Sequence, residues 1–301
     1  MNRDLQDVCK FKDYVVELAK ARVNSLLVGE KPSPWKGLGV DVEDFREYTY
    51  GDDYRNIDWK ISARLPYIEN PRFVVKEFGE EKALNTIILL DASASMGFGL
   101  KWATALTSLI IILEVARKLK DRIGLIVKNS EKKLLVLPTG ASGLDAYILS
   151  KLCRGKIKPT GHVKLREVVD EIYPYISRRF FIVLITDFAH EVEDFREAIK
   201  LLKEKSLGLG AIMVQDKREL KVPSNGLITL KDLETESTLG LLRSEDPTLL
   251  SAILKRHFRA ILLTLKSHSI PYVQLNGLIE TLHKTSKIIS IYGRGREATY
   301  V

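Results

Sequence analysis

The chain has 301 residues, of which 45% are apolar and 29% are charged, and its formal net charge is +8. This composition is typical of a globular protein that can bury a sizeable core. No apolar run approaches the roughly 18 to 20 residues of a membrane span, and the first residues, MNRDLQDVCKFKDY, lack the apolar core of a signal peptide. We therefore expect a cytoplasmic protein without a membrane segment.

The basic excess is uneven along the chain. Residues 1–80 carry a net charge of −2, residues 81–190 carry +7 and residues 191–301 carry +3. The basic residues form short groups without the interleaved aromatic side chains that stack on nucleic-acid bases. Ordinary solvated faces explain them better than a nucleic-acid-binding surface does.

Cysteine and histidine give little functional signal. The two cysteines, Cys9 and Cys153, are far apart in the sequence, and the five histidines are scattered. We expect two reduced thiols and no zinc site.

The N-terminal part combines a helix with an unusual acidic block. Apolar residues recur at helical intervals over residues 5–27, which predicts an amphipathic helix. A break rich in proline and glycine follows, GEKPSPWKGLG, and then DVEDFREYTYGDDYRNIDWKISARL, in which acidic and aromatic residues alternate. Residues 73–78 look like a strand, and residues 1–80 are predicted to be an extension that precedes the main domain.

From about residue 81 strands alternate with helices. Strands are expected at 86–90, 122–127, 180–185, 210–214 and 271–275, with a short antiparallel strand at 134–137. Helices are expected at 101–119, 142–153, 164–176, 193–205 and 247–267. This alternation predicts an α/β domain over residues 81–301, with a doubly wound, mostly parallel sheet covered by helices on both faces.

Polar residues follow two of these strands directly. The strand TIILL runs into Asp91, Ser93 and Ser95 at alternating positions, and FFIVLIT runs into Asp187. Ligands of such sheets bind beyond the carboxyl ends of the strands. If the two strands are neighbours, we expect the four side chains to converge.

Three chemical interpretations of this pattern differ in what they explain. A helix cap would use one of these residues. A phosphoryl-transfer nucleophile at Asp91 would need a second acid, but Ser93 stands where that acid belongs. A hard cation such as Mg²⁺ prefers several oxygen ligands and so accounts for the whole set.

The sequence D-A-S-A-S at one strand end, with I-T-D at another, resembles the von Willebrand factor A domain and its metal-ion-dependent adhesion site. The resemblance implies that Asp91, Ser93, Ser95 and Asp187 hold Mg²⁺ or Mn²⁺ and that a partner protein completes the shell with an acidic residue. The family also uses a threonine from a third loop. Thr160 is the better candidate, although it is out of register with the family pattern, and Thr139 is a poorer one.

The acidic block narrows the resemblance further. The stretch EYTYGDDYRNIDWKISAR, followed by VVKEF and the DASAS motif, resembles the signature of domain-of-unknown-function family 58 (DUF58), and so does QDKRELKVP. Genes of this family commonly neighbour those of MoxR-type AAA+ ATPases, which implies an adaptor or co-chaperone acting on such an ATPase or its client. Within the block, Asp52, Asp53, Arg55, Asp58 and Trp59 either form an internal salt-bridge network or a partner-docking surface.

These observations favour a non-enzymatic, metal-dependent protein-interaction module. One alternative is a Mg²⁺-dependent phosphoesterase or nuclease using the same crevice, with Glu191 or His190 as the general base. A second alternative is a nucleic-acid-binding protein that uses the basic excess of residues 117–179.

Overall fold

The computed structural model describes residues 12–27, 42–64, 73–78, 83–140, 143–154, 157–220, 227–231, 238–243 and 247–297. The chain forms two compact units. The larger one comprises residues 1–29 and 83–301, and the smaller one comprises residues 30–82.

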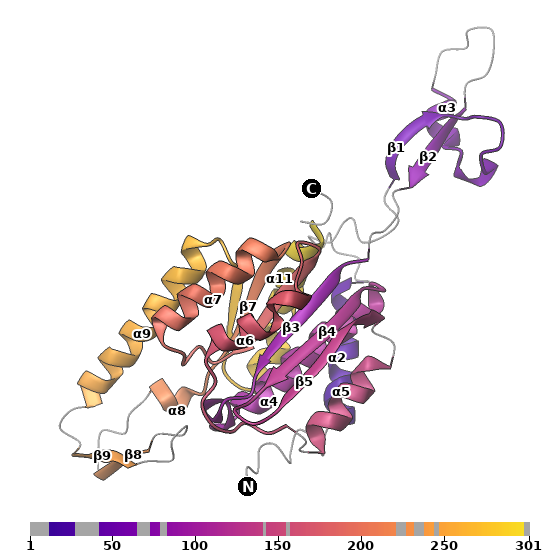
Figure 1. The fold of residues 1–301 in the computed structure, drawn as a ribbon. Coiled ribbons are helices and arrows are strands. Elements are labelled where there is room, and N and C mark those ends of the chain that lie inside the picture. Colours follow the sequence, from indigo (N-terminus) through magenta and orange to yellow (C-terminus); the bar gives the residue numbers. More distant parts are fainter. Residues whose placement is uncertain are drawn as a thin grey trace. The chain divides into compact units, whose positions relative to one another are not determined.

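A six-stranded sheet forms the centre of the larger unit (Figure 1). Its order is β10-β7-β6-β3-β4-β5, and every neighbouring pair is parallel except β4 and β5. The predicted doubly wound, mostly parallel sheet is therefore confirmed, as is the antiparallel strand after the second parallel one. The strands are β3 (Asn85–Asp91), β4 (Arg122–Lys128), β5 (Lys133–Gly140), β6 (Phe180–Thr186), β7 (Gly208–Val214) and β10 (Tyr272–Leu275).

Helices cover both faces of this sheet, and Figure 1 shows the two layers. On one face α6 (Leu165–Ile172), α7 (Val192–Lys205) and α9 (Pro247–Ser267) pack on alternate residues of the strands, such as Ile87 and Leu89. The other face is covered by α4 (Lys101–Lys118), α10 (Leu278–His283) and α11 (Thr285–Glu297). Because β3, β6 and β7 are buried on both sides, their sequences are continuous apolar runs rather than alternating ones.

Helix α4 is buried over residues 101–116. Its few hydroxyl groups do not need outside partners, since Thr104, Thr107 and Ser108 each donate to the carbonyl four residues earlier. Its burial is completed by α2 (Lys12–Leu27), whose Val15, Ala19 and Val23 form a buried stripe. The predicted division at residue 80 placed this helix with the extension, whereas in the structure it packs on α4.

Shorter elements complete the larger unit: η2 (Ala94–Gly97), α5 (Leu144–Cys153), η3 (Tyr173–Tyr175), α8 (Lys217–Leu220) and an antiparallel pair, β8 (Leu227–Lys231) with β9 (Thr238–Arg243). Cys153 ends α5 and is disulfide-bonded, so the expectation of a reduced thiol is wrong for this residue. Cys9, the other cysteine of the chain, lies outside the described residues. In the part of the chain described, no helix combines the length and apolar character needed to cross a bilayer.

The smaller unit contains an antiparallel pair, β1 (Val42–Glu47) and β2 (Val74–Phe78), with η1 (Tyr54–Asn56) and α3 (Trp59–Ser62) between them in sequence. Ile57 is buried and forms a bridge to Val75, which ties the loop to the strand pair. The Ser62 hydroxyl donates to the carbonyl of Asp58 and accepts the Val74 N–H at 2.9 Å, which fixes α3 to the start of β2.

Candidate functional site

The residues of the DASAS motif and Asp187 meet at one edge of the sheet. Strand β3 pairs with β6 directly, and Leu90 lies opposite Ile185 in the register. Both strands end at this level, so Asp91 and Asp187 are carried to neighbouring positions beyond the carboxyl ends. Both are buried, at 9% and 2% exposure. The predicted convergence of these two carboxylates is therefore present.

Asp91 is held by three donors from its own surroundings. Its Oδ1 accepts the N–H of Ser93 at 2.8 Å, and its Oδ2 accepts the Thr186 hydroxyl at 2.8 Å. The Nε2 atom of His190 lies 3.2 Å from the same Oδ2. Burial alone would raise the pKa of Asp91, but these hydrogen bonds, led by that of His190, hold it below its ordinary value.

His190 acts as the positive partner of Asp91. Burial opposes its charging, but the hydrogen bond to Asp91 and the nearby carboxylates outweigh burial and raise the pKa of His190 to about 9. The second ring nitrogen, Nδ1, lies 3.1 Å from the carbonyl oxygen of Val163, so an imidazolium can donate from both nitrogens. The raised pKa favours the imidazolium form of His190 and disfavours its use as a general base at neutral pH.

Asp187 is paired with a lysine that the sequence did not single out. The Nζ atom of Lys101 donates to Asp187 Oδ2 at 2.7 Å, and it also forms an ion pair with Glu219. Burial opposes the charge of Lys101, whereas the two carboxylates more than compensate and raise its pKa. Burial raises the pKa of Glu219 further than the contact with Lys101 lowers it. Lys101 is 1% exposed, so this is an interior ion cluster.

The turn at Asp187 is shaped around these contacts. The N–H of Ala189 donates to Asp187 Oδ1 at 3.0 Å, and Phe188 between them has a left-handed backbone with φ of 58°. Such a conformation is costly for a bulky residue. The Phe188 ring compensates by complete burial and by an edge-to-face contact with Phe195 at 5.2 Å between centroids.

A third strand end contributes to the same edge. Asp216 follows β7, accepts the N–H of Leu100 at 3.1 Å at the start of α4, and is paired with the Arg218 guanidinium at 2.9 Å. Arg218 holds the pKa of Asp216 well below its usual range. Gly99 makes room for this turn, since a Cβ there would lie 2.0 Å from Asp216 Oδ2. Three neighbouring strands therefore deliver carboxylates to one place.

The hydroxyl groups of the motif are directed to near neighbours. The Oγ atoms of Ser93 and Ser95 are 3.1 Å apart and share a hydrogen bond. Thr160 lies alongside the motif loop, because its N–H donates to the Ala92 carbonyl at 3.0 Å, while its hydroxyl faces the Lys158 carbonyl at 3.5 Å. Thr139 pairs with Ile123 near the start of β4, whereas Asp91 pairs with Lys128, so Thr139 lies at the opposite edge of the sheet.

These contacts decide whether the residues fit a divalent cation. Mg²⁺ needs several oxygen atoms directed at one point, at about 2.0–2.1 Å. Each of the four carboxylate oxygens of Asp91 and Asp187 already accepts a hydrogen bond, and Lys101 places its charge against Asp187. In this arrangement the residues fit a divalent cation poorly, because Lys101 already supplies a positive charge to Asp187.

Sequence reasoning missed Lys101, Glu219 and Thr186. A signal existed for the first, because Lys101 is the only charged residue in the first three turns of a helix that is otherwise apolar or small there. A signal existed for the second as well: QDKREL follows an apolar strand in the same way as DASAS and TDF.

In the smaller unit, each predicted docking acid has a local structural partner. Asp52 accepts from both terminal nitrogens of Arg46 at 2.7 and 2.8 Å, and Asp53 is paired with Arg55 at 2.7 Å. Asp58 caps α3 by accepting the N–H groups of Lys60 and Ile61, both at 3.0 Å. These contacts correspond to the internal network that was one of the two interpretations. Trp59 is 61% exposed and contacts the Phe73 ring edge-to-face.

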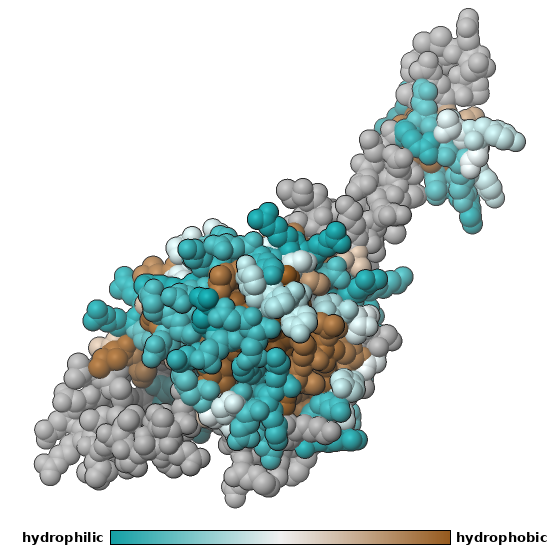
Figure 2. Space-filling model, viewed as in Figure 1, coloured by the Kyte–Doolittle hydropathy of each residue, from teal (hydrophilic) through white to brown (hydrophobic). Residues whose placement is uncertain are grey.

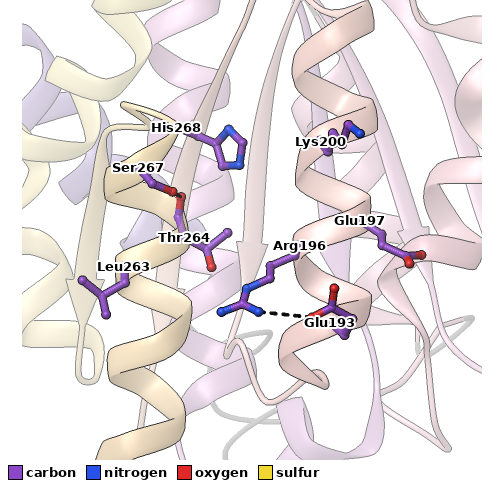
Figure 3. Close-up of a pocket in the computed structure, with 8 residues that line it drawn as sticks. All are labelled: Glu193, Arg196, Glu197, Lys200, Leu263, Thr264, Ser267 and His268. Atoms are coloured by element: carbon purple, nitrogen blue, oxygen red, sulfur yellow. Dashed lines mark hydrogen bonds and ion pairs between the residues drawn. The ribbon is translucent and has the colours of Figure 1, made fainter.

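In the larger unit, two hollows are lined by described residues. A groove of about 550 Å³ runs between α7 and α9, and Figure 3 shows Glu193, Arg196, Glu197 and Lys200 on α7 opposite residues of α9. Charges of alternating sign at this spacing are typical of a solvated helix face. A much smaller cavity adjoins His190, Thr186 and Asp91. Neither hollow presents the strand-end carboxylates to a substrate-sized ligand.

Figure 2 shows apolar side chains at the surface in the region of β4 and β5. On β5, Leu134, Leu135 and Val136 are half-buried and Leu137 is 55% exposed. A further apolar pair lies beside the site: Leu100 at the start of α4 and Ile279 on α10, which are 37% and 74% exposed. Exposed apolar residues gathered at one place are typical of interaction surfaces.

Comparison with known proteins gives a family but no activity. The family model described as "Protein of unknown function DUF58" matches residues 44–253. The uncharacterized protein Rv1480 of Mycobacterium tuberculosis and the uncharacterized protein Mb1516 of Mycobacterium bovis are each 25% identical over 237 residues, which covers 76% of this chain and 71% of the relative.

Similar solved structures include a conserved hypothetical protein, BatB, from Bacteroides thetaiotaomicron, at 17% identity over 70% of this chain and 100% of that one, with a TM-score of 0.41. The VWA domain of SpRpn10 is similar at 11% identity over 69% of this chain and 94% of that one, with a TM-score of 0.38.

Gly99 and Gly143 offer a matched pair of substitutions. Both have positive φ, at 55° and 76°, but a Cβ at Gly143 would meet nothing within 4 Å. Gly143→Ala is expected to cost about 1 kcal/mol of unfolding free energy for the backbone alone. Gly99→Ala is expected to cost about 3 kcal/mol, because it also displaces Asp216 from Arg218 and the Leu100 N–H. Denaturant titration measures both, and equal losses would contradict the role assigned to this turn.

The Asp91–His190 pair predicts a pH dependence of stability. The folded-state pKa of His190, about 9, exceeds the ordinary value of 6.5, so its contribution is complete below pH 6.5 and is lost as pH rises through 9. Between these values the unfolding free energy should fall on the order of 1 kcal/mol per pH unit from this group. His190→Gln should remove that slope, as measured by denaturant titration across the range. Parallel profiles for the two proteins would contradict the assignment.

Proposed function

Because the chain belongs to the DUF58 family of proteins of unknown function and has the sheet architecture expected from its resemblance to adhesion-type domains, we propose that it is a non-enzymatic protein-interaction module. The observation that supports this proposal is the state of the strand-end groups. Asp91, Asp187 and Lys101 are buried, and each is committed to an internal partner. A nucleophile or a general base must instead reach its substrate.

The alternative of a phosphoesterase or nuclease meets two physical obstacles. Both carboxylate oxygens of Asp91 already accept hydrogen bonds, and the raised pKa of His190 disfavours its use as a base at neutral pH. Glu191 is exposed but stands at the start of α7 without a nucleophile identified beside it. A nucleic-acid-binding role would depend on the basic residues between 117 and 179, among which Lys128 and Lys133 are paired with Glu171 and Arg166 with Asp170.

The proposed docking surface is the rim, the exposed residues around the carboxyl ends of the central strands. We define it as Leu100, Lys217, Arg218 and Ile279, which are exposed residues from α4, α8 and α10. An ideal Cβ at Gly277, two residues before Ile279, would lie 3.6 Å from the Leu100 side chain, so α10 begins beside α4. A surface of this kind suits a partner that offers an apolar side chain next to an acidic one.

The partner proposed for this surface is a MoxR-type AAA+ ATPase or a client of that ATPase. The proposal comes from the family resemblance, and the rim supports only the chemistry of the contact. In the version expected from the sequence, Mg²⁺ or Mn²⁺ on Asp91, Ser93, Ser95, Thr160 and Asp187 would receive the partner's carboxylate. The poor fit of these residues to a metal favours direct contact with the rim instead.

Three isoleucine and leucine substitutions test the location of the surface. Ile279→Ser should weaken capture of a MoxR-type ATPase from the same organism about tenfold or more, since burying such a side chain contributes about 1.5–3 kcal/mol. Ile253→Ser on α9, at a residue 56% exposed, is the control and should leave the dissociation constant unchanged. Titration by biolayer interferometry gives the constants. Loss of capture with Leu137→Ser on β5 instead of Ile279→Ser would move the surface to the open sheet face and contradict the proposal.

The smaller unit offers a second, independent contact. Since Asp52, Asp53 and Asp58 are engaged locally, the exposed rings of Tyr50, Tyr54 and Trp59 are groups that a partner can reach. Trp59→Ala should weaken capture by about 2 kcal/mol or more if the ring docks, as buried interface tryptophans do. Far-ultraviolet circular dichroism should be unchanged. An unchanged dissociation constant would leave this unit with a structural role only.

A further inference from the structure

We infer that Lys101 is the resident cation of the strand-end edge and that its ammonium group takes the role that a divalent metal ion has in adhesion-type sites. In that case no metal ion is needed to neutralise the carboxylates at the carboxyl ends of the strands. This inference concerns the site alone and holds whichever partner binds at the rim.

The position of the ammonium group is the first support. It lies between carboxylates from two neighbouring strand ends, Asp187 after β6 and Glu219 after β7, with Nζ 2.7 Å from Asp187 Oδ2. The Phe98 ring closes one side, with its centroid 5.9 Å from Nζ. A metal ion would occupy the same kind of position, since it too would join carboxylates carried by different loops.

The local energetics are the second support. Lys101 is the first residue of α4, where the helix dipole is positive and a cation is disfavoured. It is also buried, which adds a desolvation cost. A lysine persists under both costs only where opposite charges compensate, and Asp187 with Glu219 supply that compensation.

The other hydrogen bonds to the strand-end carboxylates oppose the binding of an additional cation. The other oxygen of Asp187 accepts the Ala189 N–H, and both oxygens of Asp91 are taken by Ser93, Thr186 and His190. A divalent ion would have to share oxygen atoms that already accept hydrogen bonds, and it would lie close to the ammonium group of Lys101. Repulsion between like charges at such distances, in a buried site, opposes its binding.

Five proteins test the inference: the wild type, Lys118→Ala, Lys101→Arg, Lys101→Ala and Asp91→Asn. In the wild type, millimolar Mg²⁺ should change the melting temperature by less than about 1 °C, whereas an ion bound at 100 times its dissociation constant would raise it by about 5 °C or more. The electron paramagnetic resonance signal of free Mn²⁺ should be unchanged by adding the protein. Lys118→Ala, at an exposed residue at the end of the same helix, should behave as the wild type does.

Changes at Lys101 should alter the response to metal. Lys101→Arg retains the charge and should remain indifferent to Mg²⁺ and Mn²⁺, even if its melting temperature falls. Lys101→Ala should melt at a lower temperature and gain Mn²⁺ binding, seen as loss of the free-ion signal. That gain would not follow from a role in packing alone.

The outcome that overturns the inference is saturable Mn²⁺ or Mg²⁺ binding by the wild type that is abolished in Asp91→Asn. A Lys101→Ala protein as stable as the wild type and equally indifferent to metal would also overturn it. If Lys101→Ala does not fold, the wild-type and Lys101→Arg titrations decide the question. None of these experiments measures partner capture. Failure of this inference would therefore leave the interaction proposal in place, with a metal ion bound at the strand ends.

Discussion

The buried contact of Lys101 with Asp187 and Glu219 is the constraint on which the strand-end edge depends. It joins the start of α4 to the turns after β6 and β7, so three separate connections are fixed by one ammonium group. Removing one partner of such a buried cluster leaves an unpaired charge, which typically costs about 3–5 kcal/mol, a large share of an unfolding free energy of about 5–15 kcal/mol. The neighbouring turn is fixed in a similar way, because Asp216 accepts the N–H of Leu100, the N-cap residue of α4, and Gly99 allows its close approach.

A second ion pair, Asp91 with His190, lies one strand away and is equally buried. The central position of β3 explains why both pairs gather here, because β4 and β6 flank it and its carboxyl end has neighbours on either side. Two internal cations, Lys101 and His190, offset much of the negative charge of the buried carboxylates beside them. Specific contact with another protein then depends on the exposed rim, where Leu100 and Ile279 supply apolar area and Arg218 lies over the Phe98 ring.

The central sheet could be predicted because each of its six strands has a local signal, whereas α10 and α11 were not expected. The apolar runs that become β3, β6 and β7 and the helical period of α7 are visible in the sequence, and their alternation implies the sheet. The contacts of Lys101 could not be predicted in this way, since they join residues 86 and 118 positions apart through side chains alone. The place of α2 was missed for a similar reason: its apolar stripe fits either unit, and only packing on α4 decides. In the acidic block, the pairing of Asp53 with Arg55 is local and followed from the sequence, whereas that of Asp52 with Arg46 needed the turn at Gly51.

The DASAS motif itself has a structural meaning that does not involve a metal. Asp91 accepts the Ser93 N–H and Ser93 shares a hydrogen bond with Ser95, so the alternating polar residues fold the loop onto itself. These contacts would be made whether the cation beside them were Mg²⁺ or an ammonium group. What selects the cation lies outside the motif, in a lysine at the start of the next helix and a glutamate after a third strand. A metal cannot therefore be inferred from the five motif residues alone, because the same loop can surround a charge that the chain provides itself.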